Sequence, residues 1–198
     1  MKNIKKLIIL FTIIFLLPIK SFGLIEVDIT RGNLNPLPLA VSPLSIDEKS
    51  RKSFKGLFKK ENIGLEISSI VENNLRTSGL FNPLNKDAFL QAPDIANLKP
   101  RFEDWNLIKA QALITGKVNF DDDKLRVEFR LWDVLAGKEM MALAFTTVPN
   151  NWRRVGHIIS DKVYERLTGE KGYFDTRIIY VAEEGPKTNR IKKLAIMD

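Results

Sequence analysis

Three consecutive segments of alternating apolar and polar residues, 112–120, 125–134 and 139–148, constrain the fold of this chain most strongly. Alternation with a period of two is typical of strands that bury one face. Short polar turns join the segments, and such turns connect antiparallel neighbours. The polar face of the second segment carries Arg126, Glu128 and Arg130. The pattern therefore predicts an antiparallel meander whose apolar face must be covered by a second layer.

Two amphipathic helices, at about 62–77 and 151–169, are predicted to form that layer. The apolar residues of the later helix recur at offsets of three, four, eight and twelve: Val155, Ile158, Ile159, Val163 and Leu167. We expect Asn150 or Asn151 to cap this helix and Gly169 to end it with a positive φ. The fold class is α/β of the α+β type, a two-layer sandwich of a mixed, largely antiparallel sheet covered by two main helices.

The other segments of this region are less regular. Residues 37–44 form a short apolar run between prolines, which predicts a buried strand near a sheet edge. Residues 47–60 are rich in lysine and contain few residues to bury, so a short helix and a loop both remain open. Residues 92–101 are punctuated by prolines and are interpreted as a linker, followed by a short helix at 102–109.

The first 23 residues have the pattern of a secretory signal peptide. A basic start is followed by an apolar run at 7–17 and by the small-x-small triplet Ser21-Phe22-Gly23, which predicts export and cleavage after about Gly23. This run is shorter than the about 20 residues that span a bilayer. A retained anchor or a buried helix are the alternatives. The segment carries four lysines, and without them the net charge falls from +7 to +3, which argues against nucleic-acid binding.

Residues 24–34 would form the new N-terminus. Ile25, Val27 and Ile29 alternate with Glu26, Asp28 and Thr30, so an extended segment would have one apolar and one polar edge. Two interpretations are open. The segment is an ordinary first strand of the domain, which the alternation alone favours, or a detachable arm that adds as a strand to another protein's sheet.

The C-terminal residues 172–198 contain two further predicted strands, one at 176–182 and one that begins near residue 190. Two strands do not form an independently stable sheet, which needs three or more strands with an apolar face. Either these strands pair with the domain, or the sheet to which they belong lies in sequence that is missing.

This sequence offers few candidate catalytic residues, because it has no cysteine and a single histidine. A hydrolase would have to combine His157 with Ser160 or Ser45, but a lone histidine on a helix surface is more often structural. The acidic turn at 121–123 lacks the glycine and the bidentate acid of a calcium loop, and no phosphate-binding loop occurs. The sequence predicts a binding module that is not an enzyme and has no cofactor, metal or small-molecule substrate.

Four stretches carry a resemblance to a known family: LIEVDITRGN, ISSIVENNLRTSGLFNPL, LITGKV and NWRRVGHIISDKVYERLTGEKGYFDTRIIYV. Together they resemble the N-terminal domain of the TolB family, the periplasmic component of the bacterial Tol-Pal system. The resemblance covers residues 24–198. It implies a partner-binding arm at 24–34, an α/β domain at 35–171, and a hinge with an incomplete first blade of a β-propeller at 172–198.

The same resemblance implies the function. TolB proteins are periplasmic adaptors that support outer-membrane integrity, cell division and bacteriocin import. Their arm engages the inner-membrane protein TolA, which assigns partner binding by strand addition to Ile25, Glu26, Val27, Asp28, Ile29 and Thr30. Their propeller binds the lipoprotein Pal, and in the family the exposure of the arm depends on what the propeller has bound. Because the chain matches only the first propeller strands, it is interpreted as truncated, Pal binding is not carried over, and a non-functional remnant is a further alternative.

Overall fold

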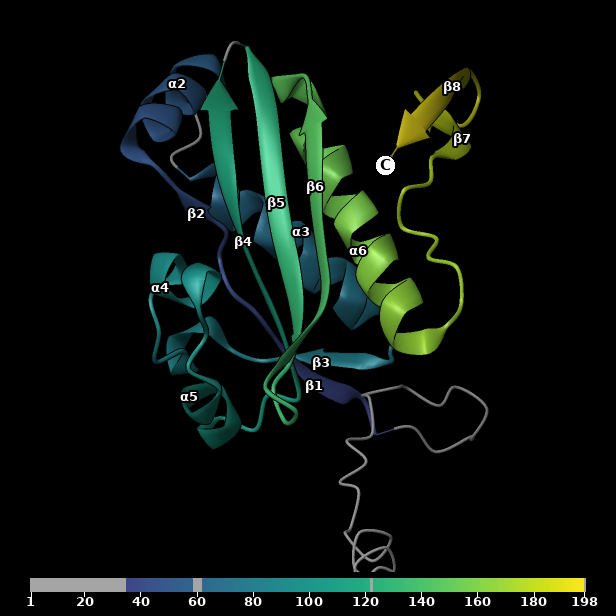
Figure 1. The fold of residues 1–198 in the computed structure, drawn as a ribbon. Helices are drawn as coiled ribbons and strands as arrows, with labels where there is room; N and C mark the ends of the chain where they lie inside the picture. The colour runs from purple at the N-terminus through teal and green to yellow at the C-terminus, as the bar shows by residue number, and fades with distance from the viewer. Residues whose placement is uncertain (1–34, 59–61, 122, 198) are drawn as a thin grey trace, which may run out of the picture.

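The computed structural model describes residues 35–58, 62–121 and 123–197. A six-stranded sheet forms the centre of the molecule, and its helices lie on both faces (Figure 1). The strands of this sheet are β1 (Leu37–Val41), β2 (Ser45–Ile46), β3 (Phe81–Pro83), β4 (Ala112–Asp121), β5 (Lys124–Asp133) and β6 (Lys138–Thr147). The helices are α2 (Glu48–Phe58), α3 (Ile63–Thr77), α4 (Pro93–Leu98), α5 (Phe102–Leu107) and α6 (Trp152–Thr168).

The sheet is mixed, as the sequence predicted. Its order is β3-β1-β4-β5-β6. The short strand β2 also pairs with β4, at residues 117–118, which follow the residues of β4 that pair with β1. The strands β1 and β3 run parallel to each other, and β1 also runs parallel to β4. The β4-β5-β6 meander is antiparallel throughout, with short turns between strands that pair almost along their full length. The three strands predicted from alternation are therefore confirmed.

The main core lies between this sheet and the helices α3 and α6. Both helices cover the face formed by alternate residues of β4 and β5, which is the face predicted to be apolar. The buried side chains of this layer include Ile67, Val71, Leu75, Ile114, Val127, Phe129, Leu131, Val155, Ile159, Val163 and Leu167. The predicted two-layer sandwich is confirmed, because the helical stripes at 62–77 and 151–169 both face the sheet.

A second, smaller core lies on the opposite face, where the sequence predicted a linker at 92–101 and a short helix at 102–109; the short helix is present as α5. Residues 93–98 form the helix α4, so the interpretation of 92–101 as a linker is wrong. Pro93 occupies the first turn, where a missing N–H costs no helical hydrogen bond. Trp105 of α5 is 1% exposed and donates from Nε1 to Gln91 Oε1 at 2.9 Å. It packs with Ala40, Ala110, Leu113 and Val134.

The structure settles the open choice at residues 47–60 in favour of a helix. Asp47 accepts a hydrogen bond from the backbone N–H of Ser50 at 2.8 Å, as expected of a residue that caps a helix. This bond is the main cause that lowers the pKa of Asp47 below its ordinary value. Phe54 then anchors α2 in the main core, and this one buried aromatic side chain offsets the polar character of the helix.

The two ends of α6 differ in how well the sequence predicted them. Gly169 has a φ of +76° and donates its N–H to Glu165, so the predicted helix stop is confirmed. The predicted asparagine cap is wrong for Asn151, whose side chain makes no cap bond and donates instead to Thr147 Oγ1 at 3.1 Å. The reason is the 3-10 turn Pro149–Asn151, which leads directly into the helix.

The last two strands, β7 (Ile178–Glu184) and β8 (Ile191–Met197), form a separate antiparallel hairpin. Within the described ranges neither strand pairs with the main sheet, and the apolar side chains on both faces of the hairpin are exposed, including Ile179 and Leu194. Both predicted strands are therefore present, and their assignment to a propeller blade stays a prediction. None of the helices in the described residues has the length and apolar character needed to cross a membrane.

We predict that the α3 stripe dominates the stability of the domain. Leu75 is 0% exposed, whereas Leu98 of α4 is 83% exposed. Leu75→Ala should lower the free energy of unfolding by about 2–5 kcal/mol, because it leaves a cavity in the main core. Leu98→Ala is the matched control and should change it by less than about 0.5 kcal/mol. Urea unfolding measures both values, and equal losses would contradict this location of the core.

Candidate functional site: the junction between α3, α6 and residues 172–175

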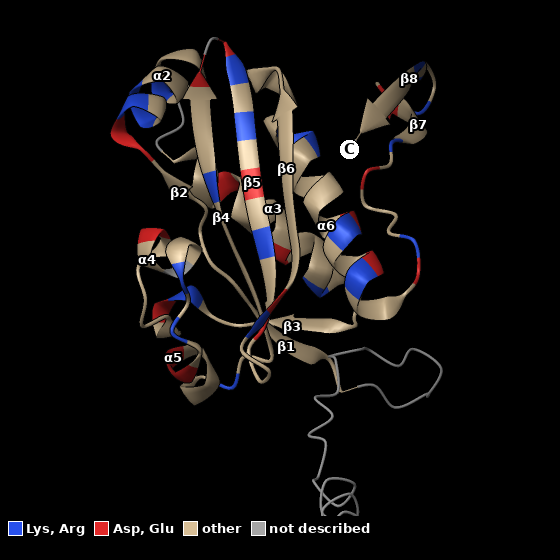
Figure 2. Cartoon of the chain, in the orientation of Figure 1, with Lys and Arg blue, Asp and Glu red and all other residues tan. Residues whose placement is uncertain are grey.

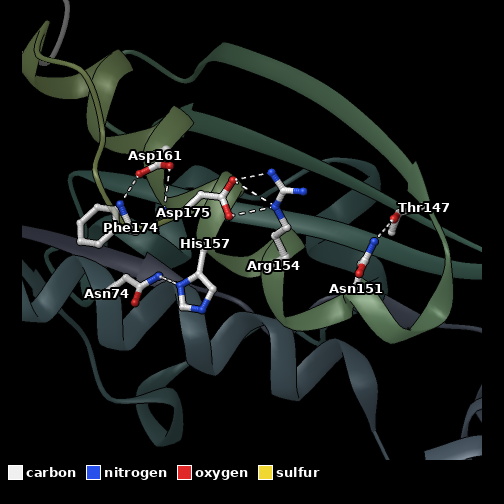
Figure 3. A network of polar contacts seen from close by, with 8 residues as sticks. All are labelled: Asn74, Thr147, Asn151, Arg154, His157, Asp161, Phe174 and Asp175. Atoms are coloured by element: carbon white, nitrogen blue, oxygen red, sulfur yellow. Dashed lines mark hydrogen bonds and ion pairs between the residues drawn. The ribbon is translucent and has the colours of Figure 1, made fainter. Parts of the chain in front are cut away.

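The predicted partner-binding residues, Ile25 to Thr30, lie outside the described residues, as does the predicted signal peptide. The structure does describe the other residues that the sequence singled out, around His157 and in the segment after Gly169. Figure 3 shows both groups on either side of α6. We describe first the contact of α6 with α3 and then its contact with residues 172–175.

Asn74 joins α3 to α6 through two polar contacts. Its Nδ2 lies 2.9 Å from His157 Nδ1 and 3.0 Å from Ser160 Oγ (Figure 3 draws the first). Because an amide N–H₂ can only donate, Nδ1 is the acceptor and the neutral imidazole carries its proton on Nε2. Nε2 is buried and has no hydrogen-bond partner in the described part of the chain. His157 thus has a structural contact at the crossing of the two main helices.

The contacts of the two serines do not support the hydrolase alternative. Ser160 is buried and donates its hydroxyl proton to Gly156 O at 2.9 Å, a bond within its own helix. Ser45 of β2 donates to Gly116 O of β4 at 3.2 Å. A catalytic base must accept the proton of its nucleophile, but His157 Nδ1 already accepts from Asn74. The side-chain amide of Asn74 lies between His157 and Ser160 and contacts both. These polar groups therefore serve the packing of α3 against α6.

On its other side α6 holds the chain that follows it. The carboxylate of Asp161 accepts two backbone bonds, from Phe174 N to Oδ1 at 2.6 Å and from Asp175 N to Oδ2 at 3.1 Å. The backbone at Gly172 lies so close to α6 that a Cβ atom added there would lie 2.4 Å from Asp161 Cα. Only glycine therefore fits at position 172 with this path of the backbone.

A bidentate ion pair and a group of aromatic rings complete this contact. Arg154 Nε lies 3.0 Å and Nη2 3.0 Å from the two carboxylate oxygens of Asp175. The hydrogen bond to Asp175 is the first cause that raises the pKa of Arg154, and charge attraction is the second. Tyr164 packs edge-on against both Tyr173 and Phe174, with ring centroids 5.5 and 5.8 Å apart. We call this set the α6 clasp: Arg154, Asp161, Tyr164, Gly172, Tyr173, Phe174 and Asp175.

Sequence reasoning singled out one stretch that contains all of these residues, NWRRVGHIISDKVYERLTGEKGYFDTRIIYV, but did not pair any of them. The available signal was Gly172, a second glycine three residues after the helix stop with no turn of its own to explain it. The pairing of Asp161 with residues 13 and 14 positions later depends on how the backbone doubles back along the helix. That path depends on tertiary packing, and no periodicity of the sequence predicts it.

Comparison with known proteins identifies the family. The sequence model of the TolB amino-terminal domain matches residues 25–140, which is more than half of the chain. The chain belongs to the TolB family. The resemblance inferred from the four sequence stretches is therefore confirmed, and the matched residues include the predicted partner-binding residues 25–30 and all strands of the main sheet except most of β6.

One relative and one solved structure show the extent of this similarity. The chain is 82% identical over 189 residues to the Tol-Pal system protein TolB of Pelagibacter ubique (strain HTCC1062). That alignment covers 96% of the chain but 42% of the relative, so the chain spans less than half the length of this TolB. The crystal structure of TolB from Acinetobacter baumannii matches with a TM-score of 0.64 and 22% identity. It covers 88% of the chain and 39% of the solved structure, and it supports the fold described above.

We predict that Asp161 fastens residues 174–175 to α6. Asp161→Asn keeps the size of the side chain but turns an N–H₂ group toward one of two N–H donors. Hydrogen bonds to a charged group are worth about 1.5–3 kcal/mol, so the amides of Phe174 and Asp175 should exchange with solvent about tenfold faster or more. Glu165→Gln on the same helix, which removes an exposed pair with Lys162, is the control and should leave these amides unchanged. Unaltered exchange in Asp161→Asn would show that the clasp does not depend on this carboxylate.

Proposed function

We propose that this chain is a non-enzymatic adaptor of the Tol-Pal system that acts in the periplasm. The observation that carries the proposal is the 82% identity to a Tol-Pal system protein TolB over nearly the whole chain. The signal-peptide pattern of residues 1–23 supports export. In this role the chain would support outer-membrane integrity and invagination during cell division, and it would take part in bacteriocin import.

We further propose that residues 25–30 bind TolA by strand addition. Backbone hydrogen bonds would give affinity, and the apolar side chains Ile25, Val27 and Ile29 would fix the register. The family match begins at residue 25, so this segment is part of what the chain shares with the TolB family. Pal binding is left out of the proposal, because the family resemblance assigns it to a propeller beyond the residues aligned here.

The main domain would act as the rigid support for these contacts. Its core is closed by α3 and α6, and the polar groups at their crossing serve packing, with Asn74 held between His157 and Ser160. Such a support needs no catalytic group, and it needs no cofactor. The domain boundaries inferred from the sequence, with the arm at 24–34 and the α/β domain at 35–171, stay predictions.

A pull-down with the C-terminal domain of TolA tests the arm. Deletion of residues 24–31 should abolish binding, because it removes the added strand while leaving every described residue in place. The control is Asp123→Asn, a conservative change in the exposed β4-β5 turn, which should bind as the unchanged chain does. Undiminished binding by the deletion variant would overturn the assignment of residues 25–30.

A further inference from the structure

The outer edge of β6 has no partner strand among the described residues. The strand covers Lys138–Thr147, lies at the end of the sheet order, and pairs only with β5. Every second residue of such a strand directs its N–H and C=O groups away from the sheet. Because these groups readily add another strand, proteins normally protect an unpaired edge with charges, prolines, bulges or covering elements.

Protection is confined to the first part of this edge. The strands β5 and β6 shift register at Leu131 and Trp132, which leaves Met140 as the extra residue of a bulge, and Arg166 of α6 donates to Met140 O at 3.4 Å. The residues that follow, 141–147, have the sequence MALAFTT, with no charge and no proline. Figure 2 shows this part of β6 without charged residues, beside the charged bands of β5. The edge after the bulge is therefore uncharged and open.

The two faces of the open part differ in chemistry. Met141, Leu143 and Phe145 lie opposite buried residues of β5, on the face that α3 and α6 cover. Leu143 is 38% exposed, so the apolar layer is left incomplete at this edge. On the other face, which we call the open face, Ala142 and Ala144 are exposed. A strand that continues the sheet must therefore have apolar residues on one face and small or polar residues on the other.

The open part of the edge is complementary to itself. Two antiparallel copies centred on Ala144 pair all of residues 141–147, so that Leu143 lies opposite Phe145 of the second copy on the apolar face. Opposite residues of antiparallel strands share a face and the direction of their backbone groups, so in this register the free groups of both edges meet. A shift by one residue would place the apolar face of one copy beside the open face of the other. Centring the pairing on Leu143 would include the bulge.

The charged residues at the ends of the strand are compatible with this pairing. Lys138 and Glu139, at the start of β6, would come beside residues 148–150 of the second copy, which are uncharged. At that end of the neighbouring strand β5, the cations Lys124 and Arg126 lie on the open face. The side chain of Glu139 is 41% exposed, which leaves acceptor capacity for a second donor. Glu139 of each copy would therefore approach side chains of opposite charge.

We propose that two copies of this chain associate through β6 into one continuous sheet, with the two-fold axis at Ala144. The contact is isologous, because the same seven residues are used on both sides, and it closes after two copies. A contact of seven residues a side is smaller than the about 20–30 residues a side of standard interfaces. We therefore expect a reversible dimer with a Kd between about 1 μM and about 1 mM.

This association goes beyond the proposed function, because it needs no TolA. It also changes what that function would involve. A dimer carries two copies of residues 25–30, and two linked binding sites hold a clustered partner more tightly than one site does. That consequence rests on the proposed function, whereas the dimer itself does not.

Sedimentation equilibrium of the chain cleaved at the predicted site tests the inference. The weight-average mass should rise from that of a monomer toward twice that value as the concentration increases. Ala144→Lys places two ammonium groups opposite each other across the axis and should raise the Kd about tenfold or more, because like charges directly opposite each other repel. Ala144→Glu should do the same. An equimolar mixture of these two variants should restore the dimer, because a lysine then faces a glutamate.

Three further variants are controls. Ala88→Lys makes the same change at an exposed position of the 3-10 turn Lys86–Ala88 and should dimerise as the unchanged chain does. Leu194→Lys alters the exposed hairpin of β7 and β8 and should also leave the dimer intact. Deletion of residues 24–31 should leave it intact as well. This last variant separates the test from the TolA pull-down, in which the same deletion should abolish binding.

Three results would overturn the inference. A constant monomer mass up to about 1 mM would show that β6 does not pair with itself. A dimer that survives Ala144→Lys, or that Leu194→Lys abolishes, would place the contact elsewhere. Failure of the mixed Ala144 variants to associate would contradict an axis at Ala144. Dimerisation without TolA binding would support this inference alone, and TolA binding by a chain that stays monomeric would support the proposed function alone.

Discussion

The burial of one face of β4 and β5 under α3 and α6 is the constraint on which the rest of the structure depends. The two helices meet each other as well as the sheet, and Asn74 bridges them at His157 and Ser160. Buried polar groups are tolerated when they are paired, and here they fix how the two helices cross. Two further parts of the chain are attached to this layer: α2 through Phe54, and residues 172–175 through Asp161.

Most of the fold could be predicted from the sequence, because its main elements carry a clear periodicity. The meander has a period of two, and the stripes of α3 and α6 have the helical period. Where the sequence failed, local signals were ambiguous. Pro93 marks a helix start as well as a linker, and Asn151 resembles a helix cap although the preceding 3-10 turn already directs the chain into α6. The parallel pairing of β1 with β3 and β4 joins residues far apart in the chain, which no local pattern encodes.

The sequence revealed less of the junction around α6. It favoured a structural over a catalytic role for His157, and the contact with Asn74 is consistent with that prediction. It did not foresee that Asp161 would bind the backbone of residues 174 and 175, because the carboxylate and its donors meet only when the chain turns back along the helix. The family match ends at residue 140, so the clasp lies in a part of the chain that the domain model does not describe.

The clasp has a mechanical consequence. After Thr168 the chain returns along α6 until Asp175 reaches Arg154, which lies 14 residues before the helix ends, or about 21 Å along its axis. The chain therefore enters the sheet at the start of β1 and leaves the domain at the opposite end of the strands (Figure 1). A pulling force between a partner on the N-terminal residues and anything attached beyond β8 would act along the strands. It would load the hydrogen bonds between β1 and β4 in shear, so that several must break together, instead of opening them one at a time.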